Sequence, residues 1–551
     1  MIRSEVKTIL ETRFAEGVKK GLWSERAAGK FVVELPKHQG QGDFSTNFAL
    51  VLAGIEKQNP RQIAAELKNQ LERDRDIIER VEIAGPGFVN MYIRPTVWQA
   101  LIPRIIDSGV QFGRSNAGGK RRVMVEFVSA NPTGPLSIGH GRQAILGDAI
   151  ARLLEATGHD VFREYYYNDA GRQMRVLGES TRARYLELLG EESSFPEDGY
   201  QGSYIIDIAK GLQDSRGASL KAEEDVTPFK EEAEKYIFTD ISGTLQRMGI
   251  VFDNYYNERD LYENGQIDDV VENLREKGLV YDRDGAVWLR TRDLGLDQDR
   301  VIIKSSGEPT YRLPDIAYHR EKFKRGFDWL VNVMGSDHIA TVPDVLAGVQ
   351  ALGFDPEKVT VVLHQFVTLT RDGKQVKMST RKANFVTIDE LLDEVGIDPV
   401  RFFFTMRKAD SQMEFDLELA TRQSQENPVY YVQYAHARLC SIMRQAQAQG
   451  APLVAGEADL SLLVEPEELN LLKTVSGFPQ IIETSALELA PHKVIFYLME
   501  LSAQLHSYYN KHKVLTDDLQ LSRARLQLIY ALQIVLKNAL GIVGVTAPER
   551  M

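Results

Sequence analysis

Three short apolar runs rich in β-branched residues mark the middle of the chain. They are VMVEFVS at 123–129, WLVNVMG at 329–335 and VTVVLHQFV at 359–367. Stretches with the apolar spacing of amphipathic helices separate them, such as VPDVLAGVQAL at 342–352. Strands that alternate with helices predict a Rossmann-like, doubly wound parallel α/β sheet, with ligands at the carboxyl ends of its strands.

The N-terminal part of the chain has a different pattern. Residues 1–112 open with a helical stretch, continue through the loop KHQGQGDFSTN at 37–47 and a second helical stretch, and then reach GPGFVNMYI at 85–93. That last segment alternates between apolar and polar positions like an edge strand after a turn. Residues 1–112 are therefore predicted to form a small α+β domain.

The C-terminal part is helical throughout. From residue 427, NPVYYVQYAHARLCSIMRQ begins a series of helical patterns that continues almost to Met551 and predicts an all-α helix bundle over 427–551. The α/β domain then spans 113–426. Within it, a charged and mostly helical region around 171–302 interrupts the sheet and is interpreted as an insertion.

Composition agrees with a multidomain globular protein. A chain of 551 residues is too long for one compact core, and 43% hydrophobic with 26% charged residues is ordinary for a soluble protein. We find no apolar run long enough to span a bilayer, and the first residues, MIRSEVKTIL, do not have the apolar core of a secretory signal. We therefore expect a cytoplasmic protein without membrane association.

Cysteine content and charge narrow the expected partners. Cys440 is the only cysteine, so neither an internal disulfide nor a thiolate site for structural zinc is expected, and a packing role is the simplest interpretation. The net charge of -12 argues against broad, nonspecific attraction to nucleic acid. Specific RNA binding on one basic face remains compatible with it.

The first candidate for chemistry is SANPTGPLSIGHGR at 129–142, where Gly134, Gly139 and Gly141 surround His140 at a junction of strand and helix. Glycines let the backbone approach a phosphate closely, and a helix N-terminus offers free N–H groups and partial positive charge to an anion. By itself this segment is equally compatible with an ordinary tight turn.

The second candidate is KMST at 377–380, followed by Arg381 and Lys382, within the glycine-containing loop RDGKQVKMSTRKANF. Several cations there would stabilise negative charge that develops on a pyrophosphate leaving group. Alone, a basic loop is more often a solvated turn.

Together the two segments resemble the paired signatures of class I aminoacyl-tRNA synthetases. The prefix NPTGPL at 131–136 narrows the resemblance to the arginine enzymes, and GDFSTN at 42–47 and GPGFVN at 85–90 resemble elements of their N-terminal domain. The resemblance covers essentially the whole chain. It implies a tRNA-contacting N-terminal domain, a class I catalytic domain over 113–426, and a C-terminal anticodon-binding domain.

Two positions depart from the family's signatures. Ser137 stands where the first motif usually has His, and Thr380 stands where the second usually ends in Lys. A serine hydroxyl can donate to a phosphate but lacks the reach and charge of imidazole. Arg381 or Lys382 would supply the missing cation, although Arg and Lys do not bind phosphate in the same way.

A pocket for arginine is also indicated by the residues. A guanidinium group is best met by carboxylates and a hydroxyl at fixed spacing, and Tyr311 and Asp315 share one face if helical. Glu126 stands within an apolar strand pattern, where an ionised carboxylate needs a partner such as a bound cation, unless strand alternation turns it to solvent. Without the resemblance, Tyr311 would be interpreted as core and Asp315 as a solvated acid.

The resemblance assigns the remaining roles. Catalysis falls to Gly139, His140 and Lys377. The implied ATP-binding residues are Pro132, Thr133, Gly134, Ser137, Gly139, His140, Lys377, Met378, Ser379 and Arg381. The implied arginine-binding residues are Glu126, Ser129, Asn131, His140, Tyr311, Asp315 and His338. Tyr430, Tyr434 and Arg438 are the candidate tRNA contacts, with core packing as the alternative for the tyrosines, and no metal site is predicted.

The implied reaction activates L-arginine with ATP and Mg²⁺ and transfers it to the 3′ terminal adenosine of tRNA(Arg). The family is usually monomeric and generally needs tRNA for activation. A synthetase for another amino acid is disfavoured, because an apolar side chain would leave Glu126, Tyr311 and Asp315 unpaired. A catalytically impaired homologue that binds tRNA or protein remains the second hypothesis, because of Ser137.

Overall fold

A five-stranded parallel sheet lies at the centre of the molecule. The structure is a computed structural model and describes residues 1–36, 38, 40–376, 386–450 and 458–551. The strands are β5 (Arg122–Glu126), β6 (Asp160–Tyr167), β7 (Asn254–Asn257), β11 (Trp329–Gly335) and β12 (Val359–His364), in the order β12-β11-β5-β6-β7. All neighbours are parallel, which confirms the predicted doubly wound sheet. The order reverses at β5, so the ligand-binding edge is expected beside this strand.

Alternation along β5 separates the two faces of the sheet. Val123 and Val125 belong to the large core shared with α6 (Ile138–Ala156), whereas Met124 packs in a second cluster with Phe327 and Leu330. Helices α12 (Arg312–Lys324) and α13 (Val342–Ala351) lie on this second side.

Two glycines let α6 approach its neighbours closely. A Cβ added at Gly141 would lie 2.4 Å from Ile388 Cδ1, and one added at Gly147 would lie 2.2 Å from the Phe127 ring. Side chains at either position would therefore push α6 away from the sheet and from α14 (Ile388–Val395).

The region 171–302 differs from the single helical insertion that was expected. It contains two separate additions on either side of β7, which itself belongs to the central sheet. The first addition is α7 (Arg172–Leu188), α8 (Ser203–Arg216) and α9 (Thr227–Arg247). The second is α10 (Arg259–Glu263), α11 (Gln266–Glu276) and the antiparallel strands β8 (Val280–Arg283), β9 (Ala286–Leu289) and β10 (Arg300–Ile303). A four-residue strand after a long helical stretch is too short for its pattern to be recognised.

The N-terminal domain is α+β, as predicted. It contains α1 (Ile2–Lys19), β1 (Val33–Glu34), β2 (Phe44–Thr46), α2 (Phe48–Glu56), α3 (Pro60–Leu71), β3 (Ile78–Ala84) and β4 (Phe88–Ile93). The prediction of an edge strand at 85–93 is wrong, because β4 lies between β2 and β3 in an antiparallel sheet of order β1-β2-β4-β3. Its partner β2 has only three residues, too few for alternation to be recognised in the sequence.

A small mixed sheet and a helix bundle complete the chain. After β12 come β13 (Val367–Arg371), β14 (Lys374–Gln375), α15 (Ile397–Met406), β15 (Met413–Asp416) and α16 (Leu417–Thr421). The predicted bundle consists of α17 (Pro428–Ala448), α18 (Pro466–Ser476), α19 (Phe478–Leu487), α20 (His492–Lys511) and α21 (Leu519–Ile542). Helices α4 (Pro95–Gln99) and α5 (Leu101–Ser108) complete the predicted region 1–112 and pack on α18 and α21 of the bundle.

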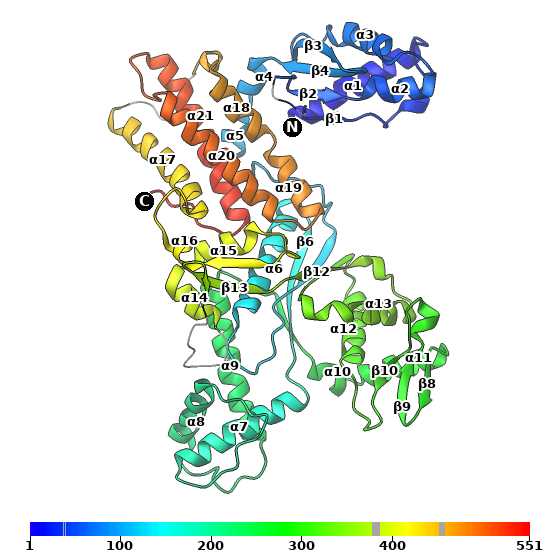
Figure 1. The fold of residues 1–551 in the computed structure, drawn as a ribbon, viewed down its shortest axis with the longest axis vertical. Helices are drawn as coiled ribbons and strands as arrows, with labels where there is room; N and C mark the ends of the chain where they lie inside the picture. Colours follow the sequence, from blue (N-terminus) through cyan, green and yellow to red (C-terminus); the bar gives the residue numbers. More distant parts are fainter. Residues whose placement is uncertain (37, 39, 377–385, 451–457) are drawn as a thin grey trace.

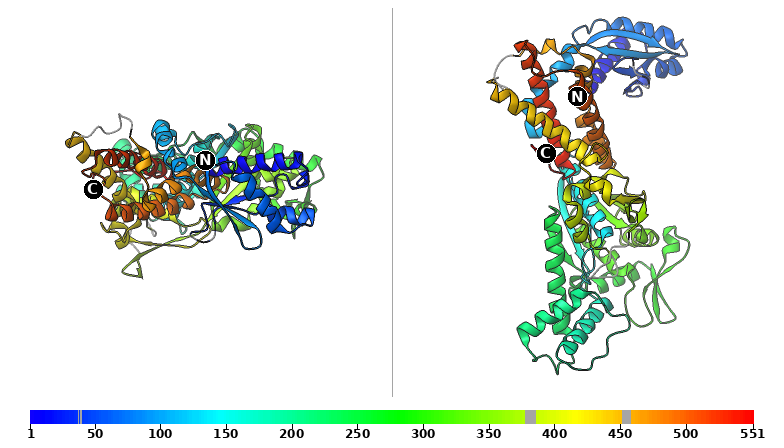
Figure 2. Two further views of the ribbon diagram at one scale, coloured as in Figure 1. Left: turned by 90° about the horizontal axis from the view of Figure 1, so that it is seen from above. Right: turned by 60° about the vertical axis from the view of Figure 1, so that its left-hand side comes forward.

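The molecule is elongated. The N-terminal domain and the bundle lie at one end, the α7–α9 addition lies at the other, and the central sheet lies between them (Figure 1). A rotated view shows the same arrangement (Figure 2). Among the described residues, no helix is long and apolar enough to cross a membrane.

Candidate active site

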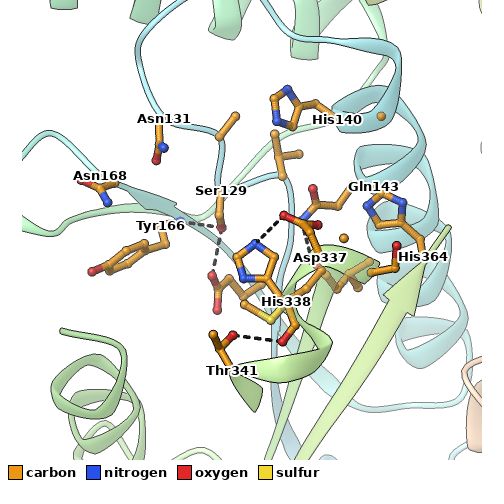
Figure 3. Close-up of a pocket in the computed structure, with 18 of the residues that line it drawn as sticks. Ser129, Asn131, His140, Gln143, Tyr166, Asn168, Asp337, His338, Thr341 and His364 are labelled. Carbon is orange, nitrogen blue, oxygen red and sulfur yellow. Dashed lines mark hydrogen bonds and ion pairs between the residues drawn. The ribbon is translucent and has the colours of Figure 1, made fainter. Parts of the chain in front are cut away.

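A cavity of about 940 Å³ opens at the carboxyl ends of the parallel strands, beside β5. Its walls come from the segments that follow β5, β6, β11 and β12, together with the start of α12, and Figure 3 shows ten of the lining residues with labels. The sequence placed its candidate residues on the same segments, and the fold brings most of them together here.

One wall of the cavity is the first turn of α6. Ser137 is the N-cap, and its Oγ accepts a hydrogen bond from the His140 backbone N–H at 3.3 Å. The Ser137 backbone N–H donates to His140 Nδ1 at 3.2 Å. Since an amide can only donate, Nδ1 carries the lone pair and the proton of the neutral ring lies on Nε2. Burial lowers the His140 pKa, which favours this neutral form.

The loop after β5 carries backbone strain. Val128 and Ser129 have φ values of 69° and 42°, in the left-handed region that β-branched residues such as valine rarely adopt. This turn directs the Ser129 hydroxyl back to Glu126 Oε1 at 3.0 Å, while its oxygen accepts from the Tyr166 N–H at 3.1 Å.

Three carboxylates line the opposite wall. They belong to Glu126, Asp315 and Glu258. Burial, with Glu126 and Glu258 nearby, raises the pKa of Asp315 to about 7. Burial also raises the pKa of Glu258, whose Oε2 accepts from the Tyr166 hydroxyl at 2.9 Å. Such a cluster is destabilised by its own repulsion and favours a cationic ligand.

Glu126 is buried, as its position in an apolar strand indicated, but its partner is not a ligand. Its Oε2 accepts from the ammonium group of Lys322, which is completely buried on α12. The sequence pattern predicts a bound cation as this partner. Lys322 was missed because it lies 196 residues away in the chain.

The predicted site residues divide into three groups. Those that line the cavity are Glu126, Ser129, Asn131, Ser137, Gly139, His140, Tyr311, Asp315 and His338. Tyr311 lies at the mouth and is 78% exposed. Pro132, Thr133 and Gly134 do not line it; the Tyr204 hydroxyl donates to Thr133 O at 2.6 Å, beneath the helical addition. Lys377, Met378, Ser379 and Arg381 lie outside the described residues.

Several cavity residues were not predicted. Glu258 directly follows β7, a strand hidden in the presumed insertion. Asp337 follows β11, and His364 is the last residue of β12. His364 is buried with Nε2 unpaired, and burial lowers its pKa to about 4. All three are polar residues at the carboxyl end of a strand of the central sheet. For Asp337 and His364 the strand was predicted from the sequence, so this position could have identified them.

Comparisons with known proteins agree with this arrangement. Residues 3–93 match the arginyl tRNA synthetase N terminal domain, 101–402 match the catalytic domain of class I (R) tRNA synthetases, and 432–551 match the DALR anticodon binding domain. The chain is 70% identical to the arginine–tRNA ligase of Desulfotalea psychrophila over 552 residues, covering 100% of each chain. It is 50% identical to that of Syntrophotalea carbinolica, covering 94% of each.

The chain belongs to the arginyl-tRNA synthetases. Its fold is similar to that of the Thermus thermophilus arginyl-tRNA synthetase, with a TM-score of 0.74, 23% identity and 100% of each chain covered. This agreement leaves no observation in favour of an impaired homologue or of a synthetase for another amino acid.

The candidate tRNA residues of this synthetase form an aromatic row on the bundle. The rings of Tyr430 and Tyr434 on α17 stack 5.9 Å apart at 8°, and His506 on α20 stacks on Tyr434 at the same distance. The Arg438 guanidinium lies 3.6 Å from the centre of the Tyr509 ring. Tyr430, Tyr434 and Arg438 are all partly exposed, so they combine packing with an accessible surface.

Proposed function

We propose that this arginine–tRNA ligase forms arginyl-adenylate in the cavity beside β5 and then transfers the arginyl group to the 3′ terminal adenosine of tRNA(Arg). The observation that carries the proposal is the opposite polarity of the two walls. Carboxylates on one wall suit a guanidinium group, and a helix N-terminus on the other suits a phosphate.

Arginine is proposed to bind along the acidic wall. Asp315 and Glu258 pair with the guanidinium group, and the Tyr311 hydroxyl contacts it from the mouth of the cavity. Glu126, Ser129, Asn131, His140 and His338 face the remainder of the amino acid. Asn131 would first release its hydrogen bond to Gln173 Oε1, which is 3.0 Å long and exposed.

ATP is proposed to bind at the start of α6. Gly139 leaves room for a phosphate beside the helix N-terminus, and Nε2–H of His140 donates to a phosphate oxygen. Ser137 lines the same wall, and Lys377, Met378, Ser379 and Arg381 are proposed to contribute from their loop. Pro132, Thr133 and Gly134, which do not line the cavity, are proposed only to shape the loop that leads to α6.

The reaction needs positioning and charge stabilisation, and no covalent enzyme intermediate. The arginine carboxylate attacks the α-phosphorus in line, and pyrophosphate leaves. Mg²⁺, bound with ATP, neutralises charge on the phosphates. His140 and the helix N-terminus stabilise charge that develops at the α-phosphate. A ribose hydroxyl of tRNA then attacks the adenylate carbonyl, the aminoacyl ester forms, and the acyl–phosphate bond breaks to release AMP.

Further parts of the proposal concern the whole chain. We expect a cytoplasmic monomer without structural zinc, with domains at 1–112, 113–426 and 427–551. The N-terminal domain contacts tRNA, and the bundle reads it through Tyr430, Tyr434 and Arg438.

The test is aminoacylation of tRNA with radiolabelled arginine and ATP, beside pyrophosphate exchange with a panel of amino acids, with and without tRNA. We expect charging with arginine alone, and exchange only when tRNA is present. An Asp315→Asn variant should raise the KM for arginine by about 100-fold or more while the KM for ATP stays near that of the unmodified protein. An unchanged KM for arginine would remove Asp315 from the proposed subsite.

A further inference from the structure

Behind the acidic wall lies a buried chain of polar groups that links β5, β11 and α12. Lys322 Nζ donates to Glu126 Oε2 and, at 3.0 Å, to Asn332 Oδ1. The Asn332 side-chain amide lies 2.8 Å from His319 Nε2, and His319 Nδ1 lies 2.8 Å from the backbone oxygen of Asp315. All three intermediate side chains are at least nine-tenths buried.

Lys322 fixes the donor and the acceptor of every hydrogen bond in this series of polar groups. An ammonium group has only donors, so Asn332 must present its oxygen to Lys322 and its NH₂ group to His319. His319 Nε2 is then the acceptor, and Nδ1–H donates to the Asp315 carbonyl. Burial, with Lys322 nearby, lowers the pKa of His319 to about 3, so the ring stays neutral.

Lys322 also sets the charge of the wall. Four carboxylates line the cavity, and three of them, Glu126, Glu258 and Asp315, form the acidic wall; Lys322 pairs with Glu126. Asp315 and Glu258 are thereby left to meet the ligand. Without Lys322, Glu126 would be a buried and unpaired charge and would compete with the other two for the guanidinium group.

We propose that Lys322 is a positioning residue for arginine: it neutralises Glu126 and, through Asn332 and His319, fixes the first turn of α12 that carries Asp315. This inference rests on the proposed arginine subsite. Lys322 does not line the cavity, so it acts through Glu126 and Asp315 and not by contact with the ligand.

The principal test is Lys322→Met, which keeps most of the length of the side chain and removes its ammonium group. We expect kcat/KM for arginine to fall on the order of 100-fold, because a buried carboxylate loses its partner, with little change in the KM for ATP. Lys324→Met on the same helix is the matched control, since Lys324 is exposed, and it should behave like the unmodified enzyme.

The pH profile separates a charge effect from loss of packing. Asp315 faces Glu126 on β5, Glu258 before α10, Lys322 on its own helix, and the hydroxyls of Tyr166 and Tyr262. Lys322 opposes the rise of the Asp315 pKa, so its loss should move the acid limb of kcat/KM for arginine upward by about one pH unit. In Glu126→Gln/Lys322→Met both charges are gone, and the limb should return toward pH 7. A packing defect would lower the rate at every pH and leave the limb in place.

Asn332→Leu keeps the Lys322–Glu126 pair and removes the hydrogen bonds of Asn332 to Lys322 and to His319. This variant should raise the KM for arginine without moving the acid limb of the pH profile. If Lys322→Met does not fold, Asn332→Leu alone tests whether the buried polar groups position Asp315. Unchanged arginine kinetics in folded Lys322→Met, or in Asn332→Leu, would overturn the inference. If Asp315→Asn itself leaves the KM for arginine unchanged, the failure belongs to the proposed subsite.

Discussion

Ser137 and His140 cap each other at the first turn of α6. The serine oxygen accepts the backbone N–H of His140 at 3.3 Å, and the serine backbone N–H donates to the imidazole Nδ1 at 3.2 Å. The main-chain N–H of Ser137 thus helps to orient the ring, and the Ser137 Oγ lies 3.2 Å from the same Nδ1. The main-chain contact does not depend on the side chain at position 137, so serine can stand where the family usually has histidine.

Ser137→Ala is accordingly predicted to be mild. The helix loses one cap, which lowers the free energy of unfolding by about 1 kcal/mol, and kcat/KM for ATP falls by less than about tenfold. His140→Ala, which removes the Nε2–H donor, should reduce kcat by about 100-fold or more. Pyrophosphate exchange in the presence of tRNA measures both variants. An equally large loss in Ser137→Ala would mean that the serine hydroxyl itself contacts ATP.

Arginine use should depend on pH near neutrality. Asp315 must be ionised to pair with guanidinium, and its pKa is raised to about 7 by burial and by Glu126 and Glu258. As pH falls through 7, the carboxyl takes up a proton and kcat/KM for arginine should fall about tenfold per unit, while kcat/KM for ATP changes less. Steady-state exchange between pH 5.5 and 8.5 tests this, and a flat arginine profile would exclude Asp315 as the titrating group.

The aromatic row on the bundle provides a prediction about tRNA. Replacing Tyr434 or Arg438 with Ala should raise the KM for tRNA about tenfold, since stacking on one base contributes roughly 1–3 kcal/mol. The KM for arginine should not change, because the row lies on α17 and α20, away from the cavity. The alternative is that these residues only pack the core. A lower melting temperature, measured by circular dichroism, with an unchanged KM for tRNA would support that alternative.

Arg401 should be a large contributor to stability. It is 98% buried, and its guanidinium pairs with Asp148 on α6 and donates to Met248 O at 2.9 Å and Val543 O at 3.2 Å. Arg401→Met removes the cation that pairs with Asp148 and leaves two backbone carbonyls without their donor. We therefore expect the free energy of unfolding, measured with denaturant, to fall by about 3–5 kcal/mol. Arg407→Met, an exposed position at the end of α15, should change it by less than about 0.5 kcal/mol.

Sequence patterns predicted the parts of the fold that repeat regularly. The apolar runs at β5, β11 and β12 and the glycine-rich junction before α6 gave the parallel sheet and one wall of the cavity. Strands β2 and β7 have three and four residues, too few for a period of two to be detected in the sequence. Because β2 was not predicted, β4 was taken for an edge strand, and because β7 was not predicted, Glu258 at its end was not recognised as a site residue.

Long-range pairing was beyond the sequence for a different reason. The Lys322 side chain has the pattern of a surface helix residue, and only the fold, which packs α12 beside β5, makes it a buried cation beside Glu126. The charge of Glu126 could be interpreted as ligand-binding from its strand, but the residue that neutralises it could not be identified without the fold.

Helix α6 has its first turn at the cavity, beginning at Ile138, and packs along its length on α15, α19 and α21. Arg401 links Asp148, in the middle of α6, to the backbone oxygens of Met248 and Val543. The first turn of α6 and the bundle thus share one continuous apolar core. Heating should therefore melt the catalytic sheet and the bundle in a single cooperative transition, and a protease should not release the bundle as an independently folded fragment.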